Sequence, residues 1–368
     1  MQVLSDITAL SQDSRAAGTK FGAEMTKFVK EKFEDSSSFV VVKQDFKFAR
    51  YVPDKFALTV NGEEYDCRPA LCSANTPIRG LSGNICSYGK TNNISARIVL
   101  VPIRKRHESL LVEELAERGA AAAIVYQEKS PLLAARVRYK KSSMPCVCVS
   151  GRIGTQLHRK GNDGIRAHIV VRSSLVEAMG TNIIATPKKA ISKLAFNAHR
   201  DSRIFSCGAV DNASGTSLLL FMARRRNPHF SLISTDAEEY GLLGAKELVR
   251  AGGLNDIASE KEVMNIDSIG EGPLHLVTKS RGGSLSARLN NDICRVANQE
   301  LNLRLGKLRT PRGSDSDVFS EGGFESSWLR SYPTPFATTV EDRSNKMSPS
   351  VLNDSCRLLT AIAEAKRV

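Results

Sequence analysis

Four short segments of this 368-residue chain carry side chains that could bind a metal ion. Each segment follows an apolar, strand-like run and supplies an imidazole or a carboxylate where that run ends. Ligands of open α/β sheets bind at the carboxyl ends of the strands, so these side chains stand where a site would form. The four candidate metal ligands are His199, Asp211, Glu239 and Asp267. One nitrogen and three carboxylates suit zinc or another divalent metal of the first transition row.

Two adjacent carboxylates, Glu238 and Glu239, follow the apolar run at 230–234. Like charges held this close destabilise a fold unless a cation or a shared proton relieves them. With Glu239 assigned to the metal, Glu238 remains as a candidate base. Any one of these acids alone would more often be a helix cap, a solvated group or an ion-pair partner. Four such segments in one chain favour the metal site.

The segments also resemble the M28 family of zinc aminopeptidases. The family pattern runs His-x-Asp, Asp-Asn-x-Ser-Gly, Glu-Glu-x-Gly and Asn-x-Asp. The chain matches it in order at residues 199–201, 211–215, 238–241 and 265–267. The resemblance implies that His199 and Asp267 hold one metal ion. It further implies that Asp211 bridges two ions and that Glu239, with a late histidine, holds the second.

Two more catalytic roles follow from this resemblance. Glu238 would be the general base of the reaction. Asp201, two residues after His199, would accept the second proton of the imidazole and so fix the tautomer of the ring. The alternative for Asp201 is an ordinary acid in a surface turn.

The chain departs from the family pattern at two histidines. Aligning residues 339–342 with the family's His-Thr-x-x-Asp segment puts Thr338 where the final histidine belongs. Ser316 stands where many members carry a histidine in a Ser-Asp-His segment. A neutral hydroxyl is a poor zinc ligand, so we expect one firmly held zinc ion and a weak second site.

The elements around these segments predict an α/β fold with a mixed, largely parallel sheet flanked by helices. Apolar residues at helical spacing predict two helices within 3–34, separated by a turn at 14–19. We expect a peptidase-like domain at 1–55 and 173–368 and an inserted, smaller β-rich domain at 56–172. Tyr51-Val52-Pro53 is expected to end the first long strand.

The predicted inserted domain resembles a protease-associated (PA) domain. Strand-like runs lie at 56–60, 96–101 and 122–126, and an amphipathic helix ended by glycine lies at 110–119. None of its residues suggests catalysis. We therefore expect a lid or a substrate-gating module.

Composition limits the setting of the protein. The net charge is +13, and residues 97–172 hold 15 Lys and Arg against 6 Asp and Glu. Without nucleic-acid motifs or interleaved aromatic residues, a solvated basic face is the simplest account. There is no run long enough to span a membrane and no Sec-type start, and the eight cysteines show no disulfide framework, so we expect a cytoplasmic protein with free thiols.

The function predicted from these observations is a zinc-dependent aminopeptidase acting on peptides through an activated water, with Glu238 as proton carrier. The main alternative is an impaired M28 homologue, a pseudopeptidase, that binds peptides or one metal ion. The missing histidines motivate it. Glutaminyl cyclisation and electrostatic binding of nucleic acid are weaker alternatives.

Overall fold

The computed structural model describes residues 2–103, 108–132, 144–160, 164–253, 257–259 and 261–367. The helices among them are α1 (Gln2–Leu10), α2 (Lys20–Glu34), α3 (Glu108–Glu117), α4 (Gly151–Arg159), α5 (Ser214–Ala223), α6 (Leu243–Arg250), α7 (Ala287–Leu301), α8 (Asp315–Glu321) and α9 (Pro349–Ala365). The strands are β1 (Phe39–Val60), β2 (Glu63–Tyr65), β3 (Arg68–Pro69), β4 (Leu81–Ser87), β5 (Ile98–Pro102), β6 (Ala122–Tyr126), β7 (Cys146–Cys148), β8 (Arg166–Pro187), β9 (Leu194–His199), β10 (Phe230–Thr235), β11 (Glu262–Ile266), β12 (Leu274–Ser280), β13 (Gly283–Ser284), β14 (Gly306–Arg309) and β15 (Glu325–Ser331).

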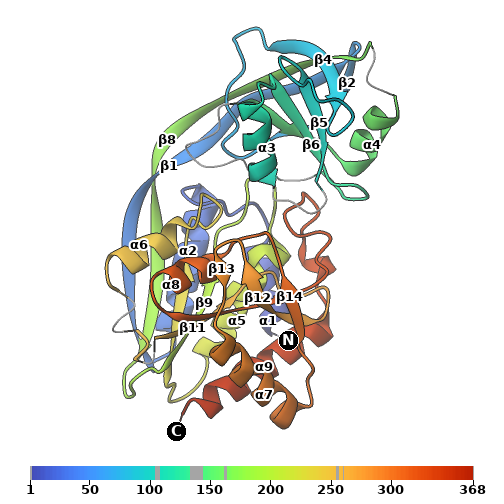
Figure 1. Cartoon of the computed structure of the whole chain (residues 1–368). Coiled ribbons are helices and arrows are strands. Elements are labelled where there is room, and N and C mark those ends of the chain that lie inside the picture. Colours follow the sequence, from blue (N-terminus) through green and yellow to red (C-terminus); the bar gives the residue numbers. More distant parts are fainter. Residues whose placement is uncertain are drawn as a thin grey trace.

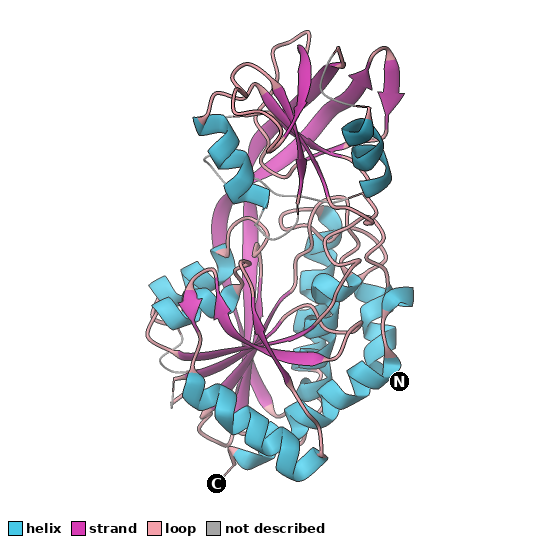
Figure 2. Cartoon of the chain, turned by 45° about the vertical axis from the view of Figure 1, so that its right-hand side comes forward, coloured by secondary structure: helices cyan, strands magenta, loops and turns pink. Residues whose placement is uncertain are grey.

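These elements form a lower part (described residues of 2–53 and 173–367) and an upper part (described residues of 54–172), which Figure 1 shows one above the other. In the lower part the strand order is β12-β15-β11-β9-β10-β8. The four central strands from β15 to β10 are parallel, and β12 and β8 are antiparallel to their neighbours. Helices flank this sheet in Figure 2. The predicted mixed, largely parallel α/β fold is confirmed.

The central strands are buried on both faces, as parallel strands between helix layers must be. Every residue of β9, β10 and β11 is buried. Helix α5 is apolar nearly all round, and nine of its ten residues are buried against the sheet and against α1, α2 and α9. The predicted pair of N-terminal helices is confirmed, and Thr19 caps α2 by accepting a hydrogen bond from the Gly22 N–H at 3.1 Å.

Strands β1 and β8 form one long antiparallel ribbon that runs through both parts (Figure 1). The expectation that Pro53 ends the first strand is wrong, because pairing continues to Val60. A register shift between Pro53 and Lys55 accommodates the residue that has no N–H. The shift lies beside Lys55 and Arg172, which pair with each other at the predicted domain boundary.

The upper part is built on the parallel strands β4, β5, β6 and β7, with the short β3 antiparallel at the edge. Strand β4 joins it to β8. Strands β5 and β6 and helix α3 lie close to their predicted places, whereas β4 and α4 were not predicted. All eight cysteines are free thiols, as predicted. None of the helices in the described ranges is long and apolar enough to cross a membrane.

Candidate metal centre

Three parallel strands bring the predicted ligands to one edge of the sheet. Strand β9 ends at His199, and β11 ends one residue before Asp267. Strand β10 ends at Thr235, and Glu238 and Glu239 follow in the next turn. Since the strands run the same way, their carboxyl ends meet, and these side chains line one small hollow.

Asp211 reaches the same hollow from an irregular turn, Ala209–Ala213, whose Asp211–Asn212 peptide bond is cis. The Asn212 side chain ties this turn to β11: its Nδ2 donates to the Ile266 carbonyl at 2.9 Å, and its Oδ1 accepts from the Gly215 N–H at 3.0 Å. A Cβ on Gly215 would lie 2.3 Å from the Ile266 carbonyl oxygen. The close approach of α5 to β11 therefore requires glycine at position 215.

His199, Asp211 and Asp267 form the group best placed to hold a metal ion among the described residues. The Nε2 atom of His199 lies 3.2 Å from Oδ1 of Asp211 and 3.7 Å from Oδ1 of Asp267. Ligands bound tetrahedrally to zinc at about 2.0–2.1 Å stand about 3.3 Å apart. The group therefore fits zinc with three protein ligands and leaves a coordination position for water or substrate.

The orientation of the His199 ring is fixed by Asp201. The Nδ1 atom lies 3.1 Å from the backbone carbonyl of Asp201 and 3.6 Å from its carboxylate. A proton on Nδ1 leaves the Nε2 lone pair directed at Asp211 and Asp267. The carboxylate of Asp201 instead accepts hydrogen bonds from the backbone N–H groups of Glu238 and Glu239, at 3.0 and 3.1 Å. Asp201 thus positions both the imidazole and the Glu-Glu turn.

Electrostatics in the hollow favour a bound cation. Burial alone would lower the pKa of His199, but the contacts with Asp201, Asp211 and Asp267 raise that pKa well above its ordinary value. Burial alone would raise the pKa of Asp211, but His199, followed by Arg203 and Arg312, holds it below its usual range. Carboxylates that favour the positive charge of a protonated imidazole would favour a metal ion in the same place.

Glu239 does not join the three-residue group. Its Oε2 atom accepts a hydrogen bond from Nε of Arg203 at 2.8 Å, and both side chains are buried. The hollow that both residues line has a volume of about 30 Å³. A guanidinium group therefore already balances the charge of the carboxylate that the resemblance assigns to a second metal.

Two further arginines line the hollow, Arg312 and Arg330. Arg330 is buried, with its guanidinium 5.1 Å from the centre of the Trp328 ring. Nothing in the sequence patterns selects these arginines. Arg203 follows Asp201 by two residues, so its position just after the His-x-Asp segment was the available signal.

The loop at 332–348, between β15 and α9, is called the C-terminal loop here. It supports the turn that carries Asp211. The two carboxylate oxygens of Asp342 accept hydrogen bonds from the backbone N–H groups of Val210, at 2.7 Å, and Asp211, at 3.2 Å. Burial raises the pKa of Asp342 to about 8, and the nearby charge of Asp211 adds to the shift. Asp342 is the last residue of the aligned His-Thr-x-x-Asp segment, and its holding role was not predicted.

Thr338 and Ser316, the residues that replace histidines, are both buried and are not among the residues that line the hollow. Thr338 has a φ of 63°, and its hydroxyl has no hydrogen-bond partner among the described residues. A β-branched residue is strained in this left-handed conformation.

A buried polar network fixes the strands below the metal group. Asp315 accepts hydrogen bonds from Thr235 at 2.5 Å and from Asn197 at 3.2 Å, and Asn197 also donates to Asn265 at 2.8 Å. These bonds join β9, β10 and β11 to the start of α8. Burial raises the pKa of Asp315 to about 6 against the opposing effects of His199 and of these hydrogen bonds.

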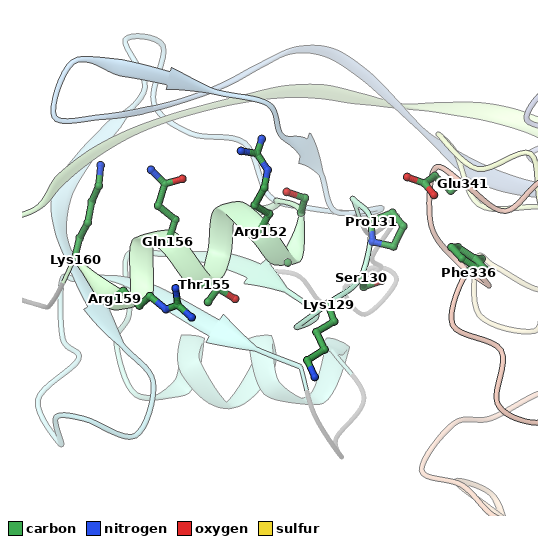
Figure 3. A pocket seen from close by; sticks show the side chains of 12 residues that line it. Lys129, Ser130, Pro131, Arg152, Thr155, Gln156, Arg159, Lys160, Phe336 and Glu341 are labelled. Atoms are coloured by element: carbon green, nitrogen blue, oxygen red, sulfur yellow. The ribbon is translucent and has the colours of Figure 1, made fainter.

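A larger cavity of about 920 Å³ lies between the upper part and the C-terminal loop. Figure 3 shows α4 presenting Arg152 and Arg159 along it, with Lys160 just after the helix and with Phe336 and Glu341 at the opposite end. The loop that carries Phe336 and Glu341 continues to Asp342, so the cavity and the metal group share one supporting segment.

Comparison with known proteins assigns the chain. Residues 182–363, which contain every candidate ligand, match the peptidase family M28. The lower part of the chain therefore carries a domain of this family. Aminopeptidase YwaD of Bacillus subtilis is 26% identical over 96% of this chain and 82% of its own length. A probable lipoprotein aminopeptidase of Mycobacterium tuberculosis, LpqL, is 25% identical over 72% of this chain and 57% of its own length.

Solved structures of M28 proteins share the fold. A zinc aminopeptidase from Bacillus subtilis superposes with a TM-score of 0.76 at 24% identity, over 100% of this chain and 95% of that one. A peptidase M28 precursor from Shewanella amazonensis superposes with a TM-score of 0.79 at 17% identity, over 98% and 91%. The likeness covers the upper part as well as the lower part.

Proposed function

We propose that this protein is a zinc-dependent aminopeptidase that removes N-terminal residues from peptides. The observation that carries the proposal is the group of His199, Asp211 and Asp267 at zinc-like spacing, with Glu238 lining the same hollow. The family and the aminopeptidases that resemble the chain support it. His199, Asp211 and Asp267 would hold the zinc ion.

Zinc bound there would supply the charge that lowers the pKa of a water molecule to about 7. Glu238, which lines the hollow, would accept a proton from a water molecule and deliver it to the amine of the leaving peptide. Asp201 keeps Glu238 in place by accepting its backbone N–H. No protein nucleophile is required.

We propose that the active protein holds one zinc ion. The ion pair of Arg203 and Glu239 supports this number, because Glu239 would have to give up a buried guanidinium partner to bind a second ion. Thr338, at the place of the late histidine, offers only a hydroxyl. The roles of Glu239 as a metal ligand and of a second ion therefore rest on the resemblance alone.

The upper part is proposed to act as a PA-like module at 56–172 that gates access of peptides. The cavity between α4 and the C-terminal loop supports this role, because a peptide could lie in it close to the segment that holds Asp211. The eight free thiols support a reducing, cytoplasmic compartment.

A pseudopeptidase that binds peptides remains the second candidate, and the replacement of two histidines by Thr338 and Ser316 favours it. The deciding experiment measures zinc content by elemental analysis and release of the N-terminal residue from aminoacyl amides. We expect one zinc ion and measurable hydrolysis in the parent protein. In Glu238→Gln, zinc content should stay while hydrolysis is lost, because an amide accepts no proton from water. A parent that binds zinc and cleaves none of the amides would be a pseudopeptidase.

A further inference from the structure

The hollow beside the metal group is lined by positive as well as negative side chains. Three arginines line a volume of about 30 Å³, and one of them, Arg203, is already paired with Glu239. The Nε atom of Arg330 donates a hydrogen bond to the Ser331 carbonyl, and its Nη2 atom donates one to the Thr334 hydroxyl. The guanidinium of Arg312 has no hydrogen bond or ion pair among the described residues, and its side chain is half-buried.

The charge balance of this lining indicates what it can bind. Four carboxylates, those of Asp211, Glu238, Glu239 and Asp267, face three guanidinium groups. One divalent ion leaves a single excess positive charge, and two ions would leave three. A substrate that brings one negative charge therefore neutralises the site that holds one ion. A substrate that brings only its protonated N-terminal amine raises the excess.

The chemistry of the two arginines matches a carboxylate. A guanidinium group presents parallel N–H donors that bind the two oxygens of a carboxylate together. The ring of Trp328 lies against one face of the Arg330 guanidinium and interacts favourably with its positive charge. This contact, rather than water, holds the guanidinium group in place. We propose that Arg312 and Arg330 bind a carboxylate of the substrate close to the scissile amide, and this inference rests on the proposed function.

The lining of the larger cavity also carries more positive than negative charge. Its lining carries Lys129, Arg152, Arg159 and Lys160 against one acid, Glu341 (Figure 3). A cavity of that size takes several residues of a peptide. An acidic peptide would therefore meet positive side chains both at the metal group and along the path beside it.

Two sources could supply the carboxylate. It could be the side chain of an acidic N-terminal residue, or it could be the terminal carboxylate of a very short peptide. Three ligands of nearly the same shape separate them. Glutamic acid α-amide has only the side-chain carboxylate, glutamine has only the α-carboxylate, and glutamine amide has neither.

The test measures binding of these three compounds by calorimetry to zinc-loaded Glu238→Gln protein, in which turnover is blocked. At least one carboxylate compound should bind about 10- to 100-fold more tightly than glutamine amide, the range of a hydrogen bond between charged groups. Adding Arg312→Gln should remove that advantage, and Arg312→Lys should keep only part of it. Adding Arg309→Gln, which removes an exposed charge at the end of β14, should leave it unchanged.

Each outcome decides the inference. Equal binding of all three compounds would overturn it. An advantage that survives Arg312→Gln would overturn it as well, because Arg312 would then take no part in binding the carboxylate. Arg330→Gln adds an independent measurement, and the Arg312 variants keep the test valid if the buried arginine proves necessary for folding.

A parallel assay separates this inference from the proposed function. The zinc-loaded parent is given Glu, Gln and Leu p-nitroanilides and the dipeptide Leu-Gly with its amide. Hydrolysis of acidic and neutral compounds at equal rates would support the aminopeptidase and refute the carboxylate preference. Arginine-dependent binding without any hydrolysis would refute the aminopeptidase and support the carboxylate site.

Discussion

Removing Arg203 should reveal what its ion pair with Glu239 contributes. The two side chains are 6% and 2% exposed, and Nε lies 2.8 Å from the carboxylate oxygen. At an effective dielectric constant of about 20, unit charges about 4 Å apart interact by about 4 kcal/mol. Arg203→Met leaves Glu239 buried without this partner, so we expect a loss of about 3–5 kcal/mol in the free energy of unfolding. Arg203→Met with Glu239→Gln should lose less, because no unpaired charge remains.

The assay is urea unfolding in buffer with a metal chelator, followed by the fluorescence of Trp328, the only tryptophan of the chain. The matched control is Arg200→Met, which breaks the neighbouring buried ion pair with Asp236 at 3.0 Å. Both single variants should be destabilised without metal. With zinc at about 100 times the dissociation constant of a new site, Arg203→Met alone should regain about 2.7 kcal/mol beyond the gain of the parent.

Two results would refute this reasoning. A loss below about 1 kcal/mol in Arg203→Met would show that the ion pair contributes little to stability. A second zinc ion bound as tightly in the parent as in Arg203→Met would show that Arg203 does not compete with a metal for Glu239. Elemental analysis of both proteins gives that number directly.

Three further predictions concern the surrounding residues. Thr338→His alone should add little zinc, whereas Thr338→His with Arg203→Met should bind a second ion; equal zinc content in the two would refute the competition. As the pH rises from about 4 to about 6, the free energy of unfolding of the parent should fall by on the order of 2–3 kcal/mol relative to that of Asp315→Asn. The reason is that the pKa of Asp315 is about 6 in the folded chain, above its value in the unfolded chain, so that ionisation favours unfolding. A flat difference between the two pH profiles would contradict the burial argument. Asn212→Ala should cost about 2–4 kcal/mol in urea unfolding, because the hydrogen bonds to Ile266 and Gly215 are lost, and a cost below about 0.5 kcal/mol would count against their role.

The sequence was sufficient for most of the fold because the decisive patterns are local. Buried runs that end at His199 and Asp267 identify parallel strands, and the place of ligands at the carboxyl ends of such strands then follows. The Asp-Asn-x-Ser-Gly segment at residues 211–215 likewise places Asp211 just before α5. Three of the four predicted ligands lie together for this reason.

The features that escaped prediction depend on contacts between distant residues. Arg203 and Glu239 are separated by 36 positions, and only the folded chain shows that they pair. Pro53 indicated a strand end because its missing N–H is a local fact, whereas the register shift that tolerates it depends on the partner strand β8. Asp342 lay within the aligned segment, but the hydrogen bond by which it supports the Asp211 turn joins residues 131 positions apart.

The β1–β8 ribbon lets the chain leave for the upper part and return at adjacent positions, without changing the chain path of the lower part. Val52 pairs with Ser174 and Pro53 with Ser173, so the chain leaves and returns at adjacent positions. A two-residue turn joining those positions would turn the same two strands into an ordinary hairpin, with the pairing from Phe39 to Val52 intact. The chain path is thus that of a hairpin whose tip carries the upper part. Packing opposes removal of that tip, because Tyr51 and Tyr240 of the lower part share one buried cluster with Leu71 of the upper part.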